Sequence, residues 1–163
     1  MSKKQIRIAL SQAGIREAIQ EIRDYYTELQ PKLKEICRRL AEIGADLAQQ
    51  SFSTAAYDGI NDVVVTYEEI PNGYKIVASG QAVCFIEFGA GVHYGGNYPG
   101  NRPAGIVGIG EYGKGQGKND YWRFNLNGKF ITTHGNAPTG ALFWTKSQLK
   151  GYLDEIAKEV FSE

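Results

Sequence analysis

The sequence contains little of what several classes of protein depend on. It has two cysteines, two histidines and one methionine in 163 residues, and the formal net charge is +0. A chain without net charge has no global field that would attract nucleic acid or a membrane surface. No stretch approaches the roughly 20 apolar residues of a membrane span. These deficits argue against a strongly basic nucleic-acid-binding domain and against a transmembrane protein.

The two cysteines and the first residues bear on the compartment of the chain. Cys37 and Cys84 stand in apolar surroundings on different predicted elements. We expect buried free thiols in a reducing cytoplasm, with a disulfide between them as the less favoured alternative. Residues 1–5 are basic but are followed by no apolar run, so we expect no secretory signal here.

The length and the apolar pattern predict a single domain over residues 1–163, with a helical part over 11–50 and the remainder over 51–163. Apolar residues recur with helical spacing on both sides of Pro31. The proline predicts either two helices or one helix kinked at this point. We expect no heptad array.

Two β-hairpins are predicted by Asn-Gly turns between β-branched and aromatic runs. The first joins residues 63–67 to 74–78, and the second joins residues 121–124 to 129–132. Residues 82–88 are a short buried segment, either a strand or a helical turn. A final helix follows, with Thr139 as its expected N-cap. The expected fold is α+β, with N-terminal helices and a C-terminal helix packed on a mostly antiparallel sheet formed by the two hairpins.

A long glycine-rich loop over residues 89–117 separates the two hairpins. Loops of this length are uncommon in compact domains and are usually functional or disordered. Its spaced aromatic and aliphatic residues suggest that it orders against a neighbouring subunit. The candidate assembly contacts are Tyr94, Tyr98, Ile106, Ile109 and Tyr112.

The motifs that suggest a cofactor or a metal lack the context that those sites need. Residues 108–113 match the letters of a dinucleotide fingerprint, but the residues after them will not start the helix that would hold a pyrophosphate. The spacings among His93, His134, Cys37 and Cys84 fit no structural zinc pattern. We therefore predict no cofactor and no metal.

Glu87 is the one carboxylate embedded in an apolar segment, between Ile86 and Phe88. Burial without a partner would be costly for it. As a general acid or base, in a hydrolase for example, it would need a second titratable group, and the two histidines are the candidates.

The competing interpretation of Glu87 is structural, and it is the one we favour. Glu87 would accept hydrogen bonds from backbone amides of the glycine turn, or from Arg102 or Arg123. The residues of this expected structural turn are Glu87, Phe88, Gly89, His134 and Pro138.

A sparse basic and aromatic patch leaves contact with nucleic acid open as an alternative function. Basic grooves with aromatic stacking platforms bind single strands. The patch consists of Lys114, Lys118, Arg123, Lys129, Tyr112, Tyr121 and Trp122.

Two segments together resemble a known family. Residues 85–91 read Phe-Ile-Glu-Phe-Gly-Ala-Gly, and after the glycine-rich loop residues 134–138 read His-Gly-Asn-Ala-Pro ahead of the last helix. This order resembles the phage minor tail-component family, the neck, tail-completion or head–tail joining proteins of long-tailed double-stranded DNA phages. Ala90 stands where the family usually has threonine, and residues 139–144 replace its usual proline-initiated apolar run.

The resemblance implies a non-enzymatic structural protein of a phage or prophage virion. It implies a place at the junction of capsid and tail, with assembly in the cytoplasm of the bacterial host. The implied partners are further copies of the chain in a ring and other neck or tail proteins, with no membrane involved.

Overall fold

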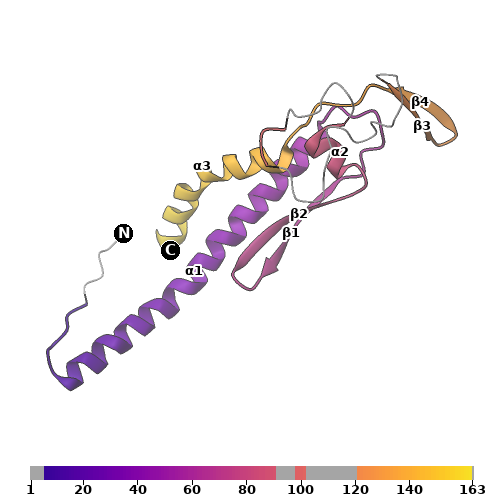
Figure 1. Ribbon diagram of the computed structural model, residues 1–163. Coiled ribbons are helices and arrows are strands. Elements are labelled where there is room, and N and C mark those ends of the chain that lie inside the picture. The colour runs from indigo at the N-terminus through magenta and orange to yellow at the C-terminus, as the bar shows by residue number, and fades with distance from the viewer. Residues whose placement is uncertain (1–5, 91–97, 102–120, 163) are drawn as a thin grey trace.

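The computed structural model describes residues 6–90, 98–101 and 121–162. The fold is α+β: a long N-terminal helix and a C-terminal helix pack with two antiparallel two-stranded sheets (Figure 1). The elements in chain order are α1 (Gln12–Ser53), β1 (Val64–Ile70), β2 (Gly73–Ser79), α2 (Val83–Phe88), β3 (Trp122–Leu126), β4 (Lys129–Thr133) and α3 (Ala141–Ser162).

Helix α1 is one helix of 42 residues that runs straight through the position of Pro31. It begins after Ser11, whose hydroxyl oxygen accepts a hydrogen bond from the Gly14 amide at 3.1 Å, as an N-cap does. Of the two alternatives that Pro31 left open, the structure has the single helix, so the expected N-terminal helices are one helix. A proline removes one helical hydrogen bond, but the helical pattern on both sides of it and the packing beyond Ile36 favour continuation.

We expect Pro31→Ala to stabilise the N-terminal half of α1, because it restores an amide that can donate to the Thr27 carbonyl and removes the ring clash. The opening free energy of residues 12–30 should rise by about 1–3 kcal/mol. Amide hydrogen exchange measures this region directly. Gln30→Ala is the matched control on the adjacent exposed position and should change exchange only slightly. Equal effects of the two substitutions would contradict the explanation.

Both predicted hairpins are confirmed. In the first, Ile70 pairs with Gly73, so Pro71 and Asn72 form the connection. In the second, Asn127 and Gly128 have φ angles of 53° and 83°, as a type I′ turn requires. The hairpins do not join into one sheet, however: the strands pair only as β1–β2 and as β3–β4. The β1–β2 hairpin lies along α1, while β3–β4 lies at the far end of the molecule (Figure 1).

The C-terminal half of α1 lies between the β1–β2 hairpin and α3 (Figure 1). Gly44 marks this close approach, because a Cβ atom there would clash with the side chains of Ile76 on β2 and Leu149 on α3. One buried cluster joins Phe52 at the end of α1 to Ala141 at the start of α3. A second joins Ile36 to Val160, so α3 runs antiparallel to α1.

The short elements settle two further expectations. Residues 83–88 form the helix α2 and not a strand. Helix α3 begins at Ala141 after Gly140, so Thr139 is not its N-cap. Within the described residues, no helix has the length and apolar run needed to cross a bilayer.

Candidate functional site

The carboxylate of Glu87 lies at the start of α3 and is only 2% exposed. One carboxylate oxygen accepts a hydrogen bond from the Leu142 amide at 2.9 Å. The other accepts from the Phe143 amide at 3.3 Å and from the Tyr98 hydroxyl at 2.9 Å. Among the described residues Glu87 thus has three donors, and none of these three is a histidine or an arginine.

Glu87 acts as the cap that the sequence next to α3 lacks. The first amides of a helix have no partner within the helix and are usually satisfied by a side chain just before it. Gly140 occupies that place and has no side chain. Glu87 reaches the second and third helical amides instead, where the positive end of the helix dipole also favours a carboxylate. Of the donors that we expected, Arg123 is not among those that bond to Glu87 in the described part of the chain, while Arg102 and most of the glycine turn lie outside the described residues.

Backbone hydrogen bonds join the α2 segment to the segment before α3. Ala90 and Asn136 exchange both amide-to-carbonyl bonds at 2.9 Å. The Thr139 amide donates to the Ile86 carbonyl at 2.9 Å, and the Gly140 amide donates to the Glu87 carbonyl at 3.0 Å. We call residues 85–90 and 134–143 with Tyr98, held together in this way, the Glu87 junction.

The other residues of the expected structural turn take different places. Phe88 is buried, with its ring centroid 4.8 Å from that of Tyr98. Gly89 has a φ of 76° and lies against Pro138. His134 is exposed, and its ring centroid lies 6.1 Å from that of Tyr121. His134 is not one of the described residues that donate to Glu87.

We expected Tyr98 to be an assembly contact, but in the structure its side chain packs within the Glu87 junction. Its hydroxyl donates to Glu87 and its ring centroid lies 6.0 Å from that of Phe143. Burial, followed by the neighbouring Glu87 carboxylate, raises the pKa of Tyr98, so the hydroxyl keeps its proton and remains a donor. The other candidate contacts, Tyr94, Ile106, Ile109 and Tyr112, lie outside the described residues. So do His93, Arg102, the glycine motif at 108–113 and Lys114 and Lys118 of the basic patch.

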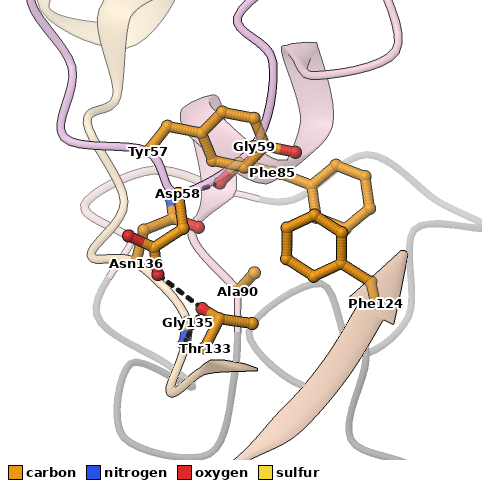
Figure 2. Close-up of a pocket in the computed structure, with 9 residues that line it drawn as sticks. All are labelled: Tyr57, Asp58, Gly59, Phe85, Ala90, Phe124, Thr133, Gly135 and Asn136. Atoms are coloured by element: carbon orange, nitrogen blue, oxygen red, sulfur yellow. Dashed lines mark hydrogen bonds between the residues drawn. The ribbon is translucent and has the colours of Figure 1, made fainter. Parts of the chain in front are cut away.

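Next to the junction is a cavity of about 240 Å³ with an aromatic wall (Figure 2). Figure 2 shows the rings of Tyr57, Phe85 and Phe124 on one side and the Asp58 carboxylate facing Thr133 on the other. The Thr133 hydroxyl donates to Asp58 at 2.6 Å. The remaining lining residues are Gly59, Ala90, Gly135 and Asn136. A cavity of this kind suits an apolar side chain, because its one carboxylate already has a hydroxyl partner.

The sequence pattern pointed to neither the cavity nor its polar pair. Asp58 and Thr133 are 75 positions apart, and neither belongs to a recognisable motif. No local signal could have brought them together.

Asp62 accepts hydrogen bonds from the residues that lead into α2. These bonds predict that the stability of the fold depends on pH. The Asp62 carboxylate accepts from the Gln81 amide at 2.8 Å and from the Ala82 amide at 2.9 Å. These bonds, that of Gln81 first, lower the pKa of Asp62. Because the folded pKa is depressed, the stabilisation is present above the unfolded pKa of about 3.9 and is lost as the pH falls through the folded value.

We therefore expect the urea midpoint to fall between about pH 5 and pH 3, and to fall less steeply in Asp62→Asn. Glu35, whose pKa is lowered to about 2 by hydrogen bonds from Arg38 and Arg39, still contributes in that variant. A pH profile of Asp62→Asn identical to that of the wild type would show that the amide bonds do not set the pKa.

The largest group of paired charges among the described residues is an ion-pair network between α1 and α3, which links Glu35, Arg38, Arg39, Glu42 and Glu159. Among the described residues, no three of His, Cys, Asp and Glu are grouped so that they could hold a metal ion. Cys37 and Cys84 are free and half-buried. Comparisons with protein-family models, with curated proteins and with solved structures find no match.

Proposed function

We propose that this chain is a structural virion protein of the neck or tail-completion class, and that it acts in assembly of the head–tail junction of a phage or prophage. One observation carries the proposal. The two segments of the resemblance, residues 85–91 and 134–138, are far apart in sequence, yet residues 85–90 and Asn136 meet in the Glu87 junction. The resemblance therefore concerns one structural unit and not two separate matches of letters.

The burial and the hydrogen bonds of Glu87 support a structural role for this residue over a catalytic one. A general acid or base needs a lone pair or a proton directed at a substrate. The Glu87 carboxylate is almost wholly buried and faces two backbone amides and a tyrosine hydroxyl. In this arrangement the carboxylate fixes the start of α3.

The junction also anchors the first part, residues 89–98, of the segment that we propose as the assembly loop, residues 89–117. Ala90 is bridged to Asn136 on one side of residues 91–97, and Tyr98 is bonded to Glu87 on the other. Anchored ends lower the entropic cost of ordering a segment when a partner binds it. Our proposal is that this loop contacts a neighbouring copy in a ring or another neck or tail protein.

Disruption of the gene in its source genome tests the proposed function. We expect electron micrographs of the resulting lysate to show filled heads and separate tails, because the joining step fails. A plasmid copy of the wild-type gene should restore complete particles. Normal infectious particles without the gene would contradict the proposal. Normal particles together with DNA binding that weakens steeply with salt would instead favour the alternative, a module that contacts nucleic acid near the portal.

A further inference from the structure

The cavity next to the Glu87 junction contains a buried oxygen atom that no described residue satisfies. Asn136 lines this cavity and is only 8% exposed. Its side-chain nitrogen donates to the Phe85 carbonyl at 2.8 Å and to the Ala137 carbonyl at 3.3 Å, so its Oδ1 atom is the acceptor. In the described part of the chain, Oδ1 accepts no hydrogen bond. Because buried polar atoms nearly always have a partner, an occupant of the cavity is expected to supply a donor here.

Asp58 supplies a second acceptor on the same side of the cavity. Its Oδ2 atom accepts from the Thr133 hydroxyl at 2.6 Å, and this hydroxyl in turn accepts from the Gly135 amide at 2.9 Å. A hydroxyl is a neutral donor, so the negative charge of the carboxylate is not compensated. No described Lys, Arg or His side chain forms an ion pair with Asp58. Asp58 lines the cavity and is nevertheless exposed, so it lies where the cavity meets the solvent.

The opposite wall of the cavity is aromatic. Figure 2 shows the rings of Tyr57, Phe85 and Phe124 across the cavity from Asp58 and Asn136. Aromatic rings pack against the methylene groups of long side chains, and their faces attract cations. None of the described lining residues is basic. The cavity therefore calls for an apolar stem that ends in a positively charged group with several donors.

We propose that this cavity binds the side chain of an arginine from another protein. A guanidinium group has five N–H donors and no acceptor, so it has donors for both Asn136 and Asp58. It stacks on aromatic rings and is more weakly hydrated than the ammonium group of lysine. Weaker hydration lowers the cost of entering a cavity with an aromatic wall.

The volume of the cavity fits this side chain. The cavity measures about 240 Å³. A cavity of about 150 Å³ is enough to bind benzene. The arginine side chain has only one non-hydrogen atom more than benzene, so it enters without a rearrangement of the walls.

The lining also favours an arginine within a polypeptide over free arginine. The carboxylate of free arginine would approach the charge of Asp58 at the mouth of the cavity, where no described lining residue is basic. An arginine within a protein has no such carboxylate. The proposal rests on the cavity alone, so it stands or falls separately from the proposed function.

Titration of the full chain with butylguanidinium, the arginine side chain without its backbone, tests the proposal. We expect saturable NMR shifts of the Asn136 side-chain amide and the Gly135 backbone amide, with a dissociation constant on the order of a millimolar for so small a ligand. Butylurea has the same shape without the charge and should bind at least about 10-fold more weakly. Butylammonium should bind several-fold more weakly, because its charge is more strongly hydrated.

Asp58→Asn tests the contribution of the charge at the mouth of the cavity. The variant keeps an oxygen for the Thr133 hydroxyl at an exposed position, so it should fold. It should weaken the binding of butylguanidinium by about 10-fold and leave that of butylurea unchanged. Asp154→Asn removes the same charge from an exposed position on α3 that does not line the cavity, and it should change neither affinity.

Four results would overturn the proposal. The absence of saturable shifts at these amides would show that the cavity takes no such ligand. Equal affinities for butylguanidinium and butylurea would show an apolar pocket without a preference for charge. Equal weakening by Asp58→Asn and Asp154→Asn would show that binding follows the overall charge of the chain. N-acetylarginine methylamide should bind at least as tightly as free arginine, and the reverse order would assign the site to the free amino acid.

Discussion

Glu87→Ala is expected to lower the free energy of unfolding by about 3–5 kcal/mol, because it leaves buried donors without an acceptor. The two amides at the start of α3 would lose their cap, and the Tyr98 hydroxyl would lose its partner. Glu87→Gln should cost less, since it keeps one acceptor oxygen but turns an amide group toward other donors. Urea denaturation followed by circular dichroism measures the free energies.

Tyr98→Phe is the matched control for this prediction, because it removes one of the three donors and leaves the carboxylate in place. Its expected cost is about 1 kcal/mol. The same substitutions separate the structural role from catalysis. If Glu87→Gln kept full stability and abolished a hydrolytic activity, Glu87 would be a catalytic residue and the structural interpretation would fail.

Gly89→Ala is expected to be the next most damaging of the substitutions considered. Gly89 has a φ of 76°, a region that costs other residues about 1–3 kcal/mol. A Cβ atom there would also lie 2.7 Å from the Pro138 nitrogen and 3.0 Å from the Asn136 carbonyl oxygen. Both neighbours are backbone atoms of the junction, so the clash adds about 1–3 kcal/mol. The two effects together predict a loss of roughly 2–6 kcal/mol of unfolding free energy.

Gly151→Ala is the opposite case and the matched control. Gly151 lies within α3, and nothing lies within 4 Å of the position of its Cβ. The substitution should therefore raise the unfolding free energy by about 0.5–1 kcal/mol through helix propensity. Thermal unfolding of both variants measures the contrast. Similar midpoints for Gly89→Ala and Gly151→Ala would show that the junction tolerates a side chain at Gly89 and is not rigid.

The parts of the fold that local chemistry determines could be predicted from the sequence. The Asn-Gly turns predicted both hairpins, and the helical spacing of apolar residues predicted the helical character of both ends of the chain. Pro31 left open whether the N-terminal part is one helix or two, and the structure has one helix, because the local cost of the proline is outweighed by the residues on both sides of it. The separation of the two hairpins into two sheets depends on what each hairpin packs against, and local propensity does not contain that information.

The sequence predicted that Glu87 needs hydrogen-bond donors, but it did not predict which residues supply them. A single carboxylate in an apolar segment indicated that Glu87 needs donors, and it has them. The identity of those donors depends on a contact across 55 positions and on a glycine where a capping side chain normally stands. The pair of Asp58 and Thr133 has no local signal at all.

We propose that this chain is a structural component of the head–tail junction, and the copy number of the chain per virion tests this proposal most directly. Quantitative mass spectrometry of purified particles, released by cells that carry the gene, gives this number relative to the capsid protein. The account predicts a fixed copy number far below that of the capsid protein, as one ring per particle requires. Complete infectious particles that contain none of the chain would contradict it.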